Sequence, residues 1–362
     1  MAIKNITDRL PDFDFDLITA RLDKNTPEYE KMGNVTIFRV GGALSLAGFL
    51  LPKNFLPLAI FLKAKKLFDN NKYIAVHAYQ ASGAAGAGWL LKYFYPKLPF
   101  IITLQEGKNL KEQGFLINFF RRLIIKKADR ATAISRYLKE YVFKINQKLK
   151  VDIIPNGVDV GNFSRKFSYG ELTDLENKLG VKPDDRVVIS ASRLVSKNGL
   201  DLLIKAIRIL NKDKQLSYRL ILAGKGSQKE ELQETAEKLG ISNKIVFAGA
   251  VNNHDLPIYL KISDVFVRPS RSEGLGSAFL EAMAAGVPIV GTRVGGIPDF
   301  LEDRKTGLFS THEPEDIAFK IRIILENDKL REDVTNNAMS LVRKKYDWNN
   351  IAEEFRKLYN QL

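Results

Sequence analysis

Two carboxylates stand eight residues apart in the chain, at Glu273 and Glu281. Glu281 interrupts an apolar run on a predicted helix that is buried on most sides, and a carboxylate in such a place needs a partner. Ser277 lies four residues earlier on the same helix face, which directs Glu281 toward the loop that carries Glu273. The alternative is that both acids form structural ion pairs, with Arg268, Arg271 or Arg193.

A strand, a loop and a helix must position these acids. The sequence predicts a buried strand at 265–268, a turn at 269–275 and a helix at 277–285 that ends at a glycine. Such a junction directs free backbone N–H groups and the positive end of the helix dipole outward, and its glycines let a ligand approach the main chain closely. The junction therefore suits a phosphate.

Two cations, Arg193 and Lys197, follow a second predicted strand at 187–191 and precede a helix at 200–210. Ligands of doubly wound α/β sheets bind at the carboxyl ends of the strands. The loop that carries the two cations is therefore a second candidate for ligand contact.

The segment from Arg268 to Asp299 resembles the retaining glycosyltransferases of family 4, whose two-domain architecture is called GT-B and whose signature is two glutamates separated by seven residues. Further segments agree with this resemblance and occur in the family's order. They are IPNGVD from Ile154, SASRLVSKNGLDLLIKAI from Ser190, LILAGKGSQKEEL from Leu220 and KIVFAGAV from Lys244.

The resemblance implies that Glu281 holds the ribose hydroxyls of a nucleotide-sugar donor and that Glu273 contacts the sugar near its leaving bond. Arg193 and Lys197 would neutralise the diphosphate, although in many relatives the lysine stands at the position that Asn198 fills here. The base would be read around 247–251. The further donor-binding residues that the resemblance implies are Gly224, Gly226, Val251, Gly274, Leu275, Gly276 and Ser277.

The expected reaction is substitution with retention, because no carboxylate is securely placed as a covalent nucleophile. Gln105 stands where relatives usually carry a histidine, and glutamine can position a sugar or an acceptor but cannot act as a base. No metal or cofactor is expected, since the chain has no cysteine and its three histidines are far apart. Asp12, Asp14 and Asp16 mimic the metal motif of another glycosyltransferase architecture, but we interpret them as edge or solvent-facing charge before the first strand.

Strand-like runs separated by helical segments predict an α/β fold with two Rossmann-like, doubly wound parallel-sheet domains facing across a cleft. The expected boundaries are 1–163, 164–346 and a last helix at 347–362 that returns to the first domain. The first series of runs is 15–19, 35–40, 74–78, 100–104, 131–134 and 151–154, and the second is 187–191, 219–223, 244–248, 264–268 and 288–291.

The first strand of the family is apparently missing from this chain, because FDFDLITARL from Phe13 looks like the family's second strand. The first strand is central in a doubly wound sheet, so its absence would leave neighbouring strands unpaired. Three explanations of the missing strand are open. The true start lies upstream, or the sheet is rearranged, or the chain is a fragment with impaired activity.

Positive charge is concentrated in the N-terminal half. Residues 1–150 hold 25 Lys and Arg against 12 Asp and Glu, or +13, whereas residues 151–362 hold 31 against 30, or +1. Segments 54–68 and 115–127 combine large apolar residues with cations, as interfacial helices do. One reading is that these segments contact an anionic membrane surface, which attracts each nearby cation by roughly 1 kcal/mol. The other is that their apolar sides pack on the N-terminal sheet and their cations face water.

The predicted function is sugar transfer from a UDP- or GDP-sugar to a lipid-linked or polysaccharide acceptor, in cell-envelope glycan or glycolipid synthesis. The chain lacks nucleic-acid-binding motifs and a signal peptide, so we expect a protein of the cytoplasm or of the cytoplasmic membrane face. The alternative is a catalytically silent or truncated module that binds nucleotide sugars or docks on membranes. The sequence does not choose the base, the sugar, the acceptor or the oligomeric state.

Overall fold

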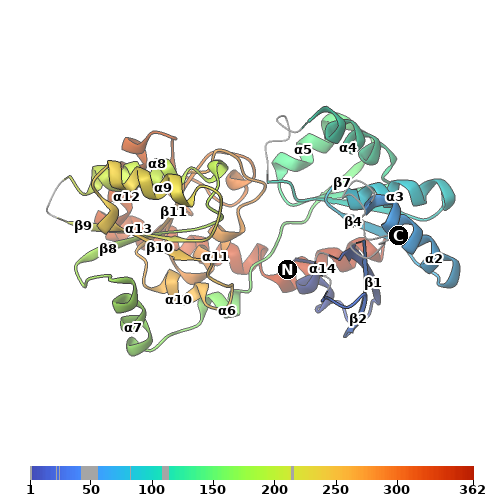
Figure 1. Cartoon of the computed structure of the whole chain (residues 1–362), viewed down its shortest axis with the longest axis horizontal. Helices are drawn as coiled ribbons and strands as arrows, with labels where there is room; N and C mark the ends of the chain where they lie inside the picture. Colours follow the sequence, from blue (N-terminus) through green and yellow to red (C-terminus); the bar gives the residue numbers. More distant parts are fainter. Residues whose placement is uncertain are drawn as a thin grey trace. The chain divides into compact units, whose positions relative to one another are not determined.

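The computed structural model describes residues 2–21, 23, 25–41, 56–81, 83–107, 114–212 and 216–362. The chain divides into two compact units, Met1–Asn156 with Trp348–Leu362 and Gly157–Asp347 (Figure 1). The first boundary therefore lies earlier than the expected one after residue 163. The reason is that Val158 donates its N–H to the carbonyl of Tyr346, which ties this segment to the second unit.

The second unit is built on one parallel sheet of six strands. Their spatial order is β10 (Ile245–Gly249), β9 (Ser217–Ala223), β8 (Asp185–Ala191), β11 (Val265–Arg268), β12 (Ile289–Thr292) and β13 (Leu308–Ser310). From β8 the chain adds β9 and β10 on one side, and then adds β11, β12 and β13 on the other. The switch point of this doubly wound sheet therefore falls between β8 and β11, where such sheets bind ligands.

Amphipathic helices cover this sheet. In α8 (Leu200–Leu210) the apolar residues Leu200, Leu203, Ile204 and Ile207 recur at helical spacing and are buried in the same core cluster as Val188 of β8. The other helices of the unit are α6 (Val160–Ser164), α7 (Tyr169–Leu179), α9 (Lys229–Lys238), α10 (Leu256–Lys261), α11 (Ser277–Ala285), α12 (Pro314–Glu326) and α13 (Asp328–Lys345).

The first unit carries two separate sheets among its described residues. One has the order β1 (Phe15–Ala20), β3 (Val35–Val40) and β2 (Tyr29–Met32), with β1 parallel and β2 antiparallel to β3. The other is fully parallel, with the order β4 (Val76–Tyr79), β5 (Phe100–Leu104), β6 (Arg130–Ala133) and β7 (Lys150–Ile153). Its helices are α1 (Ala2–Thr7), α2 (Leu56–Asn70), α3 (Gly83–Phe94), α4 (Phe115–Lys127), α5 (Arg136–Ile145) and α14 (Trp348–Tyr359).

Two hydrophobic clusters hold the first unit together. One joins Ile6 and Leu10, in and after α1, to Ile351 and Phe355 of α14. The other joins α2 and α3, and partly buried residues of β1, β3 and β4 pack against it. Both sheets are therefore anchored to helices that the chain supplies from its beginning, its middle and its end.

The expected strands overlap the observed ones, but the sequence missed β2 and β13. β2 is largely exposed and lacks the apolar alternation of a half-buried strand, and β13 has only three residues. The aspartate cluster does not lie wholly before the first strand, because Asp16 belongs to β1. Asp12 pairs with Arg356, and no group of three potential metal ligands occurs in the described part of the chain.

No helix within the described ranges is both long enough and apolar enough to cross a membrane.

Candidate functional site

The predicted donor-site residues of the second unit lie on four loops that follow neighbouring strands. Because the sheet is parallel, the carboxyl ends of β10, β9, β8 and β11 share one edge. The structure therefore brings these loops to the edge of the sheet that flanks its switch point. In the order of those strands, the residues are Val251, then Gly224 and Gly226, then Arg193 and Lys197, and last Glu273, Gly274, Leu275, Gly276 and Ser277.

Glycines allow these loops to pack against one another. A Cβ at Gly224 would lie 1.8 Å from the carbonyl oxygen of Ser192, and one at Gly226 would lie 2.1 Å from that of Leu194. The loop after β9 is also tied to the loop after β8 by an N–H of Leu194 that donates to Lys225 O at 3.0 Å. Packing between loops is thus a sufficient reason for both glycines, independent of any ligand.

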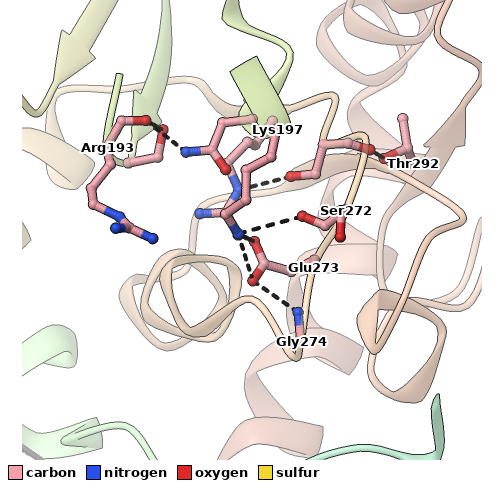
Figure 2. A network of polar contacts seen from close by, with 10 residues as sticks. Arg193, Lys197, Ser272, Glu273, Gly274 and Thr292 are labelled. Atoms are coloured by element: carbon pink, nitrogen blue, oxygen red, sulfur yellow. Dashed lines mark hydrogen bonds and ion pairs between the residues drawn. The ribbon is translucent and has the colours of Figure 1, made fainter. Parts of the chain in front are cut away.

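Glu273 is held by two cations, Arg268 and Lys197, and Figure 2 labels the second of them beside it. Its Oε2 lies 2.9 Å from Nη2 of Arg268, and both of its carboxylate oxygens lie 3.4 Å from Nζ of Lys197. The N–H of Gly274 also donates to Oε1 at 3.1 Å, so this N–H is not free for a phosphate as the sequence suggested. Glu273 therefore forms a structural ion pair with Arg268, as the alternative interpretation of the sequence expected. This ion pair is compatible with a contact between Glu273 and a donor sugar.

Lys197 sits in a partly dehydrated and positively charged environment. Burial is the largest influence, and it lowers the pKa of the ammonium. The neighbouring Arg268 and Arg193 also lower this pKa, whereas Glu273 raises it. Three cations thus share this edge of the sheet with one firmly bound carboxylate. An additional anion would relieve the repulsion among them.

Arg193 is exposed, and its guanidinium makes no hydrogen bond or ion pair with any described residue (Figure 2). Its carbonyl oxygen accepts a 2.6 Å hydrogen bond from the Nδ2 of Asn198, which is buried. Asn198 therefore braces the loop through this hydrogen bond, and the neighbouring Lys197 is the residue whose ammonium reaches Glu273.

Glu281 is half-buried on α11, and burial raises the pKa of its carboxyl to about 7 against the opposing influence of Arg268. No described residue forms a hydrogen bond or an ion pair with it. A dehydrated carboxylate without a partner is a costly feature in a folded protein and is common at ligand sites. Its acceptor oxygens are available to hydroxyl groups.

The start of α11 also lacks a side-chain cap. Gly276, at the N-cap position, has φ +100°, a value that a residue with a side chain rarely adopts. The first N–H groups of the helix receive no side-chain acceptor there, which leaves them available to an anion.

Arg268 is a candidate site residue that the sequence analysis used only as a structural partner. It is buried, its guanidinium lies over the Phe279 ring at 4.8 Å, and it influences Glu273, Glu281 and Lys197 together. An arginine at the end of the otherwise apolar strand VFVR was the signal that could have revealed it.

Gln105 belongs to the first unit, so the structure does not group it with the residues above. It follows β5, and its Nε2 donates to Oδ1 of Asn156 at 3.1 Å. The adjacent Glu106 was also missed: it is buried 3.9 Å from Arg121, and burial raises the pKa of its carboxyl. A carboxylate directly after a predicted buried strand was its sequence signal.

Two family descriptions match the chain, "Glycosyltransferase Family 4" over residues 3–162 and "Glycosyl transferases group 1" over residues 173–341. An uncharacterized glycosyltransferase of Methanocaldococcus jannaschii is 29% identical over 95% of this chain and 88% of its own. A GDP-mannose-dependent alpha-(1-6)-phosphatidylinositol monomannoside mannosyltransferase of Mycolicibacterium smegmatis is 34% identical over 51% of this chain and 50% of its own. The solved sucrose-phosphate synthase from Thermosynechococcus elongatus superposes with a TM-score of 0.84 at 19% identity, over 99% of this chain and 92% of that one.

Proposed function

Because the chain belongs to the group 1 and family 4 glycosyltransferases and has their GT-B fold, we propose that it transfers a sugar, with retention, from a UDP- or GDP-sugar to a lipid-linked or polysaccharide acceptor. The product would be part of a cell-envelope glycan or a glycolipid. The coarser assignment, a glycosyltransferase, follows from the family alone.

The observation that carries the finer proposal is the pairing of charges at the switch point of the second sheet. Glu281 is a half-buried carboxylate and Arg193 is an exposed guanidinium, and neither group forms a hydrogen bond or an ion pair with a described residue. A nucleotide sugar offers both complements, ribose hydroxyls for the carboxylate and a diphosphate for the cations. A ligand with only one of these groups would leave the other charge uncompensated.

In the proposed reaction the bond between the anomeric carbon and the phosphate oxygen breaks, and a bond from the acceptor oxygen to the same face of that carbon forms. The acceptor's proton passes to the departing phosphate oxygen, and the nucleoside diphosphate leaves. Arg193 and Lys197 would stabilise the negative charge that develops on this phosphate. Because two cations supply the positive charge, we propose that the reaction proceeds without a metal ion.

The proposal of a lipid-linked acceptor is supported by α4. Its first half exposes Phe115, Leu116, Ile117, Phe119 and Phe120, and the side of the helix that is buried includes Arg121 and Ile124. The apolar residues of this segment therefore do not all pack on the sheet, as one reading of the sequence held. The Mycolicibacterium relative acts on a phosphatidylinositol monomannoside, by its name, which agrees with a membrane-bound acceptor.

The test is a panel of UDP- and GDP-sugars, each with and without anionic liposomes that contain candidate acceptor lipids. Thermal stabilisation reports binding, and released nucleoside diphosphate reports turnover. We expect one donor to stabilise the protein. The release of nucleoside diphosphate from that donor should rise with the amount of acceptor lipid, both with and without EDTA. Release that requires an added divalent cation would contradict the metal-free mechanism.

A catalytically silent binding module is the second candidate, and it is favoured by the separation of the first unit's described strands into two sheets. Stabilisation by a donor without release in any acceptor mixture would establish this second function. Absence of any stabilisation across the panel would refute both.

A further inference from the structure

Arg268 is a charged residue at the end of a strand that is otherwise apolar. All four residues of β11 are buried, and the side chain of Arg268 is only 6% exposed. A buried charge destabilises a fold unless it is paired and hydrogen-bonded. The contacts of Arg268 therefore indicate what this charge does in the site.

The guanidinium of Arg268 is held on three sides. Its Nη2 lies 2.9 Å from Oε2 of Glu273, its Nε donates to Oγ of Ser270 at 3.2 Å, and its Cζ lies 4.8 Å from the centre of the Phe279 ring. An ion pair, a hydrogen bond and a cation–π contact together fix the position and the plane of the group. The Glu273 carboxylate is fixed with it.

Ser270, which orients the guanidinium, is itself anchored by the next two strands of the sheet. It is fully buried, and its carbonyl oxygen accepts hydrogen bonds from Oγ1 of Thr292 at 2.6 Å and from Nε2 of His312 at 3.0 Å. Thr292 ends β12, and His312 follows β13. Arg268 is therefore supported from β12 and β13, on the side of β11 that faces away from β8.

The two cations that contact Glu273 are not equivalent. Nη2 of Arg268 lies 2.9 Å from the carboxylate, whereas Nζ of Lys197 lies 3.4 Å from it on the side that Figure 2 shows. Because Arg268 already neutralises Glu273, the ammonium of Lys197 remains available to a donor phosphate. Without Arg268, Lys197 would be the only cation that the described structure places on this carboxylate.

Arg268 also lies against the start of α11. A Cβ at Gly276, the N-cap residue, would lie 3.2 Å from Nη2 of Arg268 and 3.4 Å from Cγ of Glu273. The absence of a side chain at Gly276 lets the guanidinium and the carboxylate pack directly against the first turn of the helix. Glu281 stands on the same helix, and the charge of Arg268 acts on it.

The other elements that pack against α11 bring few ionisable groups to it. α6 and β12 have none, and the buried residues of α13 are all apolar. α10 carries Tyr259 and Lys261, and the Lys261 ammonium donates to the carbonyl of Ala285 at the far end of α11. Within the described chain, Arg268 is the charged residue that lowers the pKa of Glu281, against the larger and opposite effect of burial.

We propose that Arg268 is a positioning residue of the donor site, which holds the Glu273 carboxylate in place and acts on Glu281 from the start of α11. This inference rests on the proposed function, in which Glu273 and Glu281 contact the donor. Arg268 acts through them, because its own side chain is almost completely buried. Its charge favours the ionised form of Glu281, which is the form that accepts hydrogen bonds from donor hydroxyl groups through both oxygens.

The first test needs no donor. Carbon NMR of ligand-free protein with labelled glutamate carboxyl groups follows the titration of Glu281, whose signal is assigned by its loss in Glu281→Gln. In Arg268→Met the midpoint should rise by about one pH unit, because a neighbouring cation favours the charged form of a carboxyl group. Arg219→Met is the matched control: it breaks a buried ion pair with Asp185, 3.0 Å long, at the opposite end of the same sheet, and should leave the midpoint in place.

The second test measures donor binding by calorimetry, with the UDP- or GDP-sugar that the parent chain binds. The affinity of Arg268→Met should fall at least about tenfold at pH 7 and recover most of this loss at pH 9, where Glu281 ionises without help. An equal loss at both pH values would assign Arg268 a merely structural role and overturn the proposal. A parent chain that binds no donor would refute the proposed function, whereas an unchanged NMR midpoint in a chain that binds a donor would refute the role of Arg268 alone.

A milder variant separates position from charge and guards against a loss of folding in Arg268→Met. Ser270→Ala keeps the guanidinium but removes the hydroxyl that accepts from its Nε. We expect kcat to fall several-fold while the Kd of the donor and the midpoint of Glu281 stay within about twofold and a few tenths of a pH unit, because only the placement of Glu273 is loosened. An unchanged kcat would overturn the positioning of Glu273 by Arg268.

Discussion

Glu281 combines two properties that rarely occur together in a folded protein. It is partly removed from water, and no described residue forms a hydrogen bond or an ion pair with it, although the charge of Arg268 opposes part of the effect of burial. Glu273, by contrast, is neutralised by Arg268 and Lys197. At the scale of single residues the two glutamates of the motif are therefore different, and their substitutions should have different consequences.

The first prediction concerns donor binding. Glu281→Ala removes an acceptor for ligand hydroxyls, and hydrogen bonds to charged groups contribute about 1.5–3 kcal/mol. We expect the Kd for the donor to rise about ten- to hundredfold in isothermal titration calorimetry. Glu302→Ala is the control, because Glu302 is exposed and pairs only with Lys305 among the described contacts. Equal losses in both variants would refute a specific role for Glu281.

The second prediction concerns pH. The folded-state pKa of Glu281 is raised to about 7 from its usual 4.5, so between these values the folded protein holds a proton that the unfolded chain releases. Stability therefore falls as the pH rises through this window. Glu281→Gln removes this titration. We therefore expect the unfolding free energy of the variant, minus that of the parent chain, to rise by about 2 to 3 kcal/mol between pH 4.5 and pH 8. Urea unfolding at both pH values measures it; a constant difference would contradict the raised pKa.

At the scale of elements, the site is a contact between two loops that follow adjacent strands. The loop after β8 supplies Lys197, the loop after β11 supplies Glu273, and Gly199 makes their approach possible. A Cβ at Gly199 would lie 2.0 Å from the carbonyl oxygen of Pro269. Arg271 adds a paired contact to Asp201, with N–O distances of 2.9 and 2.8 Å. The ammonium of Lys197 is thus fixed in place before a ligand arrives, which is the condition for electrostatic catalysis.

The third prediction follows from this preorganisation. Lys197→Met should lower kcat about a hundredfold or more, because the proposed stabilisation of the leaving phosphate by a fixed charge would be lost. The unfolding free energy should change by less than about 1 kcal/mol, since dehydration already disfavours this ammonium. Lys305→Met, at an exposed ion pair, is the control. A loss of kcat that merely parallels a loss of folded protein would assign Lys197 a structural role.

The fourth prediction belongs to α4. Leu116→Ser with Phe119→Ser should weaken binding to anionic vesicles about tenfold or more, because each side chain loses part of the roughly 1.5–3 kcal/mol of its burial. The melting temperature should hardly change, since both side chains are exposed. Tyr169→Ser in α7, where the tyrosine is 85% exposed, is the control in a vesicle flotation assay. Unchanged flotation of the double variant would exclude α4 as the contact.

At the scale of the whole molecule, charge and chemistry are divided between the two halves of the chain. The +13 of residues 1–150 contrasts with the +1 of residues 151–362, which contain the proposed donor site. A strongly basic half favours an anionic surface, and screening shortens the range of that attraction to about 8 Å at physiological salt. The division suggests an acceptor presented by a charged surface and a donor taken from solution.

The fifth prediction is that binding to anionic vesicles depends on salt and that this dependence arises from the basic first unit. Binding to anionic vesicles should fall about tenfold or more as sodium chloride rises from about 50 to 500 mM, whereas donor binding to the second unit should change much less. Flotation and calorimetry on the full chain measure both. Vesicle binding that persists at high salt and on neutral lipid would show that apolar contact, rather than charge, recruits the protein.

Local signals in the sequence determined most elements and the motif itself. The strand, glycine turn and helix around Glu273 and Glu281 were predictable because strand periodicity, glycine and helix-ending signals act over a few neighbouring residues. The separation of a basic half from a neutral one is likewise a property of composition. β2 and β13 were missed because short or exposed strands carry no apolar pattern.

Only the tertiary structure decided which charges meet. Lys197 reaches the carboxylate of Glu273, which Arg268 also binds, because β8 and β11 are neighbours in the sheet, although Lys197 and Glu273 are far apart in the chain. The same holds for the pairing of β1 with β3 and of β4 with β5, since strand pairing is a long-range choice that no local pattern reports. The sequence by itself determined the residues available for chemistry, and the order of strands decided which of them act together.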